Sequence, residues 1–238
     1  FVNKKALKLA SIDRNTPEPA GGKIIRDSNG EPTGVLINQA MNLLKSIIPH
    51  VDEKAKKEEF LAATRACISA GLTQVHEAGV GTAEIELYKD LIDSGELNLR
   101  IYAMLGEQEK PRFEEENLAE FFKSQRIDSY ADHMLSVRSI KLFFDGALGS
   151  RGAAFFDDYT DDLGNNGLLR ISPEYITEVS TAALEAGMGV NTHCIGTRGN
   201  SLCLDAYQAA LEKFPGKDHR FRIEHAQIVR LRDIARFD

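Results

Sequence analysis

A repeated alternation of strand-like and helix-like segments constrains the fold of this chain more than any other feature. From residue 72 onward, short apolar segments alternate with segments of helical periodicity. Strands are expected at 72–77, 98–105, 136–145, 187–195 and 220–227, separated by helices at 83–94, about 113–125, 173–186 and 200–213. Because repeated strand–helix units form parallel strands through right-handed crossovers, the pattern predicts an α/β fold with a parallel sheet.

The number of these units indicates only part of a barrel. A closed β/α barrel has eight strands in typically ~250 residues, whereas five strand candidates occupy this chain of 238 residues. We therefore expect 1–238 to be the central part of one (β/α)8 TIM barrel, about strands 2–6, with the N- and C-terminal parts of the domain missing. Helices are expected at 5–12, 39–48 and 51–70, and the Gly- and Pro-rich stretch 13–37 predicts a small β-hairpin insertion.

Composition narrows the class of partner. The 29 basic and 36 acidic side chains give a net charge of −7, which favours neither nucleic acid nor an anionic membrane as a partner. No apolar run reaches the roughly 18 residues that a membrane span needs. The three cysteines form no CxxC pair, so we expect reduced thiols and a cytoplasmic protein. The sequence also allows a homo-oligomer.

Three strand candidates carry side chains that can take part in metal binding. Lys141, His193 and His225 lie toward the ends of the third, fourth and fifth strand candidates. The C-terminal ends of barrel strands meet at one face, so side chains placed there can converge. Neutral imidazole is a common ligand of zinc-type ions, so this spacing favours a metal centre.

Side-chain alternation predicts that Lys141 lies inside the barrel. Ile140, Leu142 and Phe144 form an apolar face that should pack on the helices, which turns Lys141 and Asp145 inward. A buried ammonium is costly unless it is paired or modified. An ion pair with Asp145 or a neighbouring carboxylate is therefore the alternative to a metal role.

The same alternation places the two histidines. His193 lies near the end of its strand, before a glycine. His225 shares a face with Phe221 and Ile223 and is expected to point inward, whereas Glu224 is expected to point outward unless a bulge intervenes. A structural hydrogen-bonding role is the alternative for either histidine.

Three further residues are candidates for binding substrate. His76 lies on the first strand candidate, and a purely structural role is its alternative. Asp145 opens a loop at 145–154 that is rich in glycine and small residues, where a ligand can approach the backbone. Arg151 is the only cation of that loop and can hold a carboxylate or carbonyl, unless it only stabilises the loop.

Several segments together resemble the amidohydrolase superfamily, and within it the amidohydrolase-3 group of YtcJ-like and N-substituted-formamide-deformylase-like proteins. The resemblance covers nearly the whole chain and includes these stretches: Val2–Leu7, Gly21–Asp27, Gly30–Leu36, Gly71–Val80, Lys141–Ala154, His193–Gly196 and Arg222–Gln227. It implies a metal-dependent barrel that hydrolyses C–N bonds of amide-like, non-peptide small molecules through a metal-activated water.

The resemblance also implies roles for particular residues. Lys141, often carboxylated in this family, and His193 and His225 match the family's metal ligands from strands 4, 5 and 6, which hold one or two divalent ions, with zinc expected. A first-strand His-x-His and the proton-shuttling Asp have no counterpart, so they are expected before Phe1 and after Asp238. No catalytic residue is therefore assigned within the chain. The family usually has an Asp where this chain has Thr197, which bears on substrate preference.

Two other functions stay open on the sequence. The absence of the first and last family ligands favours a non-catalytic, barrel-derived binding or regulatory module. A desolvated barrel lysine can also form a Schiff base with a carbonyl substrate, which would make Lys141 a nucleophile.

Overall fold

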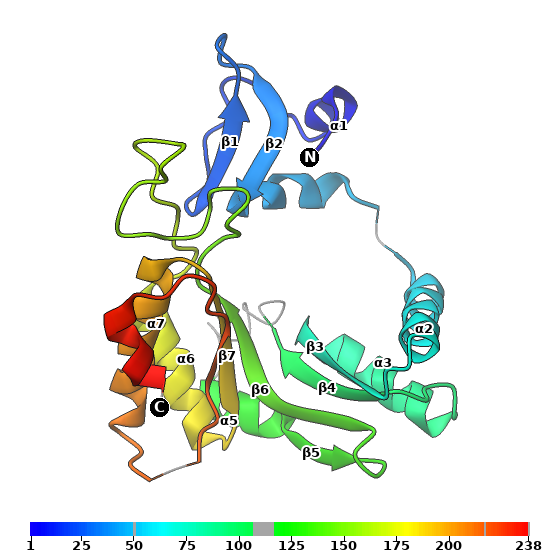
Figure 1. The fold of residues 1–238 in the computed structure, drawn as a ribbon. Coiled ribbons are helices and arrows are strands. Elements are labelled where there is room, and N and C mark those ends of the chain that lie inside the picture. The colour runs from blue at the N-terminus through cyan, green and yellow to red at the C-terminus, as the bar shows by residue number, and fades with distance from the viewer. Residues whose placement is uncertain (50, 107–116, 217, 238) are drawn as a thin grey trace.

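A computed structural model describes residues 1–49, 51–106, 117–216 and 218–237. In this part of the chain, five parallel strands form one sheet in the order β3 (Gln74–Val80), β4 (Arg100–Leu105), β6 (Leu135–Phe143), β7 (Gly189–Cys194) and β8 (Arg222–His225) (Figure 1). The predicted parallel sheet of a partial barrel is confirmed. Its two edges are β3 and β8.

One further strand was not expected from the sequence. The short β5 (Ile127–Tyr130) runs antiparallel to the first part of β6. Its two central residues, Asp128 and Ser129, are exposed, so the segment lacks the apolar run that marks the other strands. Its pairing with β6 is set by the turn that joins the two strands and not by its own composition.

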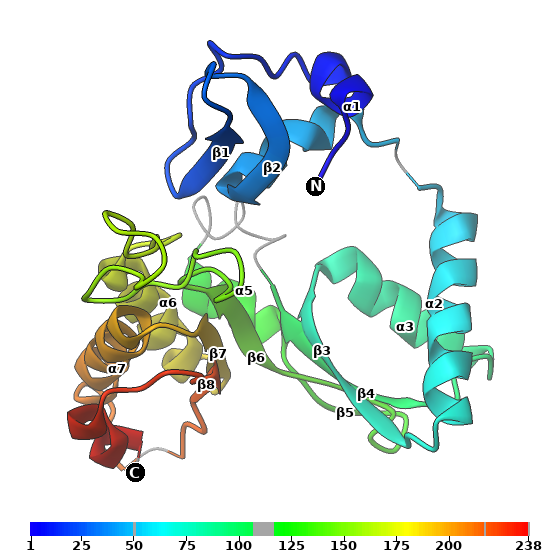
Figure 2. The same cartoon turned by 45° about the horizontal axis from the view of Figure 1, so that its top comes forward.

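Helices cover one side of the sheet. They are α3 (Thr82–Asp93), α5 (Leu118–Gln125), α6 (Pro173–Glu185) and α7 (Thr197–Leu211), and Figures 1 and 2 show them outside the curved sheet. The main core lies between the two layers and includes Leu105, Phe122, Ile140, Leu142, Phe144, Val179 and Val190. The apolar face predicted for β6 is thus confirmed. Residues 113–116 of the helix expected at about 113–125 lie outside the described residues.

The N-terminal segment forms a separate small unit above the sheet. It contains α1 (Lys4–Leu9), an antiparallel hairpin of β1 (Gly22–Arg26) and β2 (Pro32–Asn38), and the 3-10 helix η1 (Gln39–Ile47). These elements enclose a second core: Leu7, Ile12, Ile24, Leu36 and Ala40. The hairpin lies where the sequence predicted one, whereas the helix expected at 39–48 is a 3-10 helix. From this unit α2 (Glu53–Ser69), capped by Asp52, leads to β3.

Two segments complete the described fold. A long loop from residue 145 to residue 172 leaves β6, lies against the N-terminal unit, and returns to α6. Near its end, the backbone N of Arg170 donates to Phe144 O at 2.7 Å, which joins the two ends of the loop. The chain continues past β8 into the 3-10 helix η3 (Leu231–Phe237). None of the helices described combines the length and apolar composition that crossing a bilayer requires.

The two-layer core predicts a large difference between two leucines. Leu105 is 0% exposed at the end of β4, and Leu163 is 85% exposed in the long loop. Leu105→Ala is expected to lower the free energy of unfolding by about 2–5 kcal/mol, because a buried leucine leaves a cavity. Leu163→Ala is expected to change it by less than about 0.5 kcal/mol. Urea unfolding of both variants checks this, and similar losses would contradict the assigned core.

Candidate metal centre

A buried carboxylate organises the C-terminal end of the sheet. Asp145 follows β6, is 0% exposed, and accepts backbone N–H bonds from Ala154 at 3.0 Å, Ile195 at 3.0 Å and Gly196 at 2.9 Å. Gly196 is the N-cap of α7, so the carboxylate faces the positive end of that helix. Burial raises the pKa of the Asp145 carboxyl, and the three N–H donors oppose that rise. The three bonds tie the end of β6 to the long loop and to the β7–α7 turn.

Close approach at this carboxylate requires a glycine that the sequence gave no reason to single out. A Cβ on Gly199, in the first turn of α7, would lie 2.6 Å from Asp145 Oδ2. Its missing side chain lets the helix start directly over the carboxylate. Thr197, which stands where the resemblance expects an Asp, accepts a backbone N–H bond from Phe156 at 3.4 Å through its hydroxyl.

His193 lies beside this carboxylate. Its Nε2 is 3.5 Å from Asp145 Oδ1 and 3.4 Å from Gly146 O. A proton on Nε2 would serve both acceptors and leave the Nδ1 lone pair available for a ligand. The pKa of His193 is lowered to about 4, mainly by burial and in smaller part by the charges of His225, Lys141 and Arg170, while the bond to Gly146 O opposes the shift. The imidazole is therefore neutral at pH 7, which is the form that binds metal.

His225 reaches His193 by a route that strand alternation did not predict. Phe221 lies 4.8 Å from Tyr207 of α7, and Ile223 packs on the main core, so both point toward the helices. Continued alternation would turn His225 the same way. Its φ of 78° and the φ of 42° at Ala226 break the strand pattern, and its ring lies 4.6 Å from that of His193. The face predicted for Phe221 and Ile223 was wrong, although His225 does meet His193.

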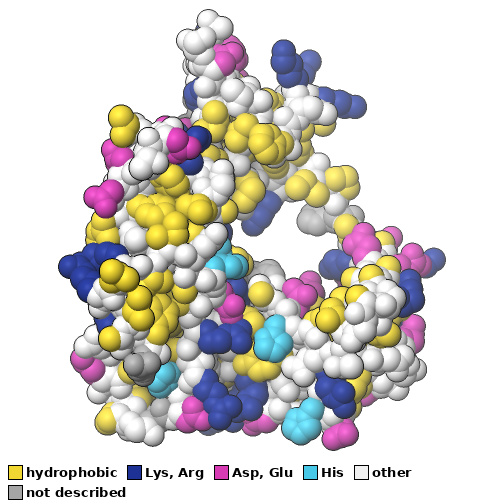
Figure 3. Space-filling view, in the orientation of Figure 1, with side chains coloured by type: hydrophobic (Ala, Val, Ile, Leu, Met, Phe, Trp, Pro, Cys, Tyr) yellow, Lys and Arg dark blue, Asp and Glu magenta, His cyan; other side chains and the backbone are white. Residues whose placement is uncertain are grey.

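Lys141 lies on the inner side of the sheet, as the alternation predicted. It is 2% exposed, and its Nζ donates to Leu142 O at 2.9 Å. The same Nζ lies 3.6 Å from the centre of the Phe143 ring, which in turn lies 5.7 Å from the His193 ring. Lys141 and His193 therefore flank one aromatic ring, and the three candidate ligands gather at the same end of β6, β7 and β8. Figure 3 shows imidazole and basic side chains over this inner side.

His76 does not join this group. It pairs in register with Tyr102 on β4, and their rings are 4.9 Å apart. Tyr102 pairs with Ser136, which precedes Lys141 by five residues on β6. At ~3.3 Å per residue this corresponds to about 16 Å along the strand. His76 thus lies at a different level of the sheet from the candidate ligands, and its role in binding substrate stays a prediction.

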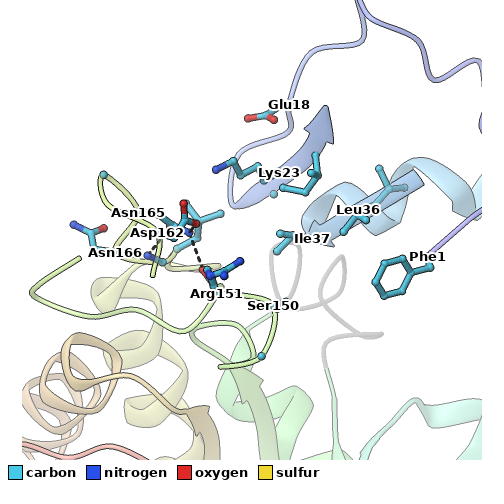
Figure 4. A pocket seen from close by; sticks show the side chains of 17 residues that line it. Phe1, Glu18, Lys23, Leu36, Ile37, Ser150, Arg151, Asp162, Asn165 and Asn166 are labelled. Atoms are coloured by element: carbon cyan, nitrogen blue, oxygen red, sulfur yellow. Dashed lines mark hydrogen bonds between the residues drawn. The ribbon is translucent and has the colours of Figure 1, made fainter. Parts of the chain in front are cut away.

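Arg151 lies on the side of the long loop that faces the β1–β2 hairpin. Its guanidinium Nη2 is 2.8 Å from Asp161 Oδ2, and its backbone has a φ of 53°. It lines a cleft of about 790 Å³ between the hairpin and residues 149–168, with Lys23, Ile37 and Asp162 among the other lining residues (Figure 4). A role for Arg151 in binding substrate also stays a prediction, and the substrate would then bind in this cleft.

The side chains present fit a metal ion only in part. The imidazoles of His193 and His225, which lie in ring contact, are suitable donors, whereas an ammonium is not a ligand. Within the described ranges, no group of three or more His, Cys, Asp or Glu side chains is arranged to hold an ion. As an ammonium, Lys141 therefore cannot contribute to such a site.

Comparisons with known proteins agree with this architecture. The amidohydrolase family model matches residues 1–238. Protein LONG AFTER FAR-RED 3 of Arabidopsis thaliana is 32% identical over 95% of this chain and 40% of its own length. The putative amidohydrolase YtcJ of Bacillus subtilis (strain 168) is 31% identical over 96% of the chain and 41% of its own length, and the N-substituted formamide deformylase of Arthrobacter pascens is 29% identical over 96% and 42%.

A solved structure extends the comparison to three dimensions. An uncharacterized metal-dependent hydrolase from Pyrococcus furiosus matches with a TM-score of 0.68 and 25% identity, over 99% of this chain and 45% of that one. The chain thus spans about two fifths of the length of the curated relatives it matches. The resemblance expected from the sequence is confirmed.

The buried carboxylate predicts a strong effect of an isosteric change. In Asp145→Asn, the amide NH2 would face either the backbone donor of Ile195 or those of Ala154 and Gly196, so the free energy of unfolding is expected to fall by about 2–4 kcal/mol. The matched change Asp161→Asn removes the charge of an exposed partner of Arg151 and is expected to cost less than about 1 kcal/mol. Urea unfolding at neutral pH separates the two, and equal losses would contradict the role assigned to Asp145.

The lowered pKa of His193 predicts a pH dependence of stability in the metal-free protein. The pKa of a histidine is about 6.5 in the unfolded chain and about 4 for His193 in the folded protein. Between these two pH values the unfolded chain binds the proton more tightly, so lowering the pH favours unfolding. Stability is expected to fall over this window by at most about 3 kcal/mol, and no further below it. His193→Gln should lose this part of the slope in urea titrations at several pH values. Equal slopes for the two proteins would contradict the shift.

Proposed function

The chain belongs to the amidohydrolase family, and on that premise we propose that it supplies the middle part of a metal-dependent hydrolase centre that acts on C–N bonds of amide-like, non-peptide small molecules. The observation that carries this proposal is the contact between two imidazoles, one of them partly buried and neutral at pH 7, beside a buried lysine. Acid–base or nucleophilic catalysis does not require two imidazoles and a lysine side by side. Divalent ions, in contrast, bind neutral imidazole readily.

Each of the three residues would have a distinct part in holding a divalent ion, for which zinc is our proposal. His193 would bind through Nδ1, because its Nε2 lies against Gly146 O and Asp145. His225 would add a second imidazole. When bound, such an ion lowers the pKa of a water molecule and polarises a substrate carbonyl.

Carboxylation would reconcile the buried position of Lys141 with a ligand role. The neutral ε-amine would form an N–C bond to CO2 and release a proton, which converts a cationic side chain into an anionic oxygen donor. A buried ammonium is costly, and the modification removes that positive charge. The proposal therefore places one anionic and two neutral donors at the ends of three successive strands.

The residues around these donors hold them in place. Asp145 fixes the β7–α7 turn that follows His193, and the Phe143 ring lies near both Lys141 and His193. Such partners set the orientation of ligands without binding the ion themselves. The choice of C–N bonds is supported by the relative named as an N-substituted formamide deformylase, and His76 and Arg151 remain candidates for binding substrate.

Metal analysis of the natural full-length protein tests the proposal. Lys141→Ala, His193→Ala and His225→Ala are each expected to weaken metal binding at least about ten-fold, measured by elemental analysis and chelator competition. His133→Ala, at an exposed position in the β5–β6 turn, is the matched control and should bind metal as the parent does. Unchanged metal binding in all three variants would exclude the proposed centre and favour a non-catalytic binding or regulatory module.

A further inference from the structure

Asn38, the last residue of β2, is held in an unfavourable backbone conformation. Its φ is 51° and its ψ is −122°, a region that glycine adopts readily and other residues rarely. The side chain does not cap η1, which starts at the next residue. The usual local reason for an asparagine at the start of a helical segment is therefore absent here.

The amide of Asn38 lies against two glycines of the long loop. A Cβ on Gly146 would be 2.6 Å from Asn38 Oδ1, and a Cβ on Gly152 would be 3.1 Å from Asn38 Nδ2. The two glycines belong to one turn, in which Gly146 N donates to Gly152 O at 3.1 Å. The asparagine side chain thus occupies the space that any larger residue at these positions would need.

This contact is not explained by hydrogen bonding. Asn38 Nδ2 is buried and has no hydrogen-bond partner among the residues that the structure describes. An unmet buried donor and a strained backbone both oppose folding. Strain of this kind persists where the surrounding structure holds it, and it gathers at functional sites.

The turn under Asn38 leads directly to the candidate metal centre. Gly146 O lies 3.4 Å from His193 Nε2, and Asp145 is the preceding residue. We propose that Asn38 is a positioning residue: by filling the space over Gly146 and Gly152, it holds the Gly146 carbonyl where that carbonyl orients the His193 ring for metal binding. This inference rests on the proposed function and adds the N-terminal unit to the parts that shape the centre.

Asn38→Gly separates positioning from a structural role in the natural full-length protein. Glycine relieves the backbone strain, so the melting temperature of the metal-free variant should stay the same or rise. Zinc affinity, measured by chelator competition, should fall about ten-fold, as for other residues that orient ligands. Hydrogen exchange of residues 146–153 should become faster. Asp132→Gly relieves a φ of 54° in the exposed β5–β6 turn and should leave zinc affinity unchanged.

A second pair of variants tests the contact itself. Gly152→Ala should weaken zinc binding in the parent, because its methyl group would meet the Asn38 amide. In the Asn38→Gly background the same change should have little effect. Equal effects in both backgrounds, or a lowered melting temperature of Asn38→Gly with parental zinc affinity, would overturn the positioning role.

His193→Ala, measured in parallel, distinguishes the two levels of the proposal. If that variant binds zinc as the parent does, the proposed centre itself fails. If it loses zinc while Asn38→Gly keeps the parental affinity, the centre stands and only the role of Asn38 is refuted.

Discussion

A carboxylate that is removed from water must take its hydrogen bonds from the protein, and the end of this sheet is built around that requirement. Asp145 receives its three bonds from a loop residue and from two residues at the start of α7. Because these bonds hold Ile195 and Gly196, the turn that directly follows β7 and its His193 has little freedom. The geometry of the candidate centre therefore follows from satisfying one buried charge.

The larger features of the fold could be predicted because they depend on periodicity. Ile140, Leu142 and Phe144 alternate with Lys141, and the structure places them on opposite sides of the sheet. The break in alternation between Ile223 and His225 could not be predicted, since it depends on a left-handed backbone at a residue that is not glycine. No local pattern signals such a conformation, which the surrounding contacts impose.

Predicting which candidates meet required more than identifying the strand on which each residue lies. His76 and Lys141 are both on strands of the sheet, but their positions along those strands differ, so only Lys141 lies with the two histidines. Arg151 belongs to the loop that follows β6, yet the path of that loop carries it to the cleft beside the hairpin. Register and loop path are set by tertiary packing, which is why the sequence grouped residues that the structure separates.

The bonds of Asp145 have a consequence for the order of folding. Its partners Ile195 and Gly196 are 50 and 51 residues away along the chain. Contacts of such separation form only after the intervening loop, α6 and β7 have docked, since the entropy of closing a long segment must first be offset. The fixed setting of His193 therefore depends on docking between distant parts of the chain, so it is expected to form late in folding.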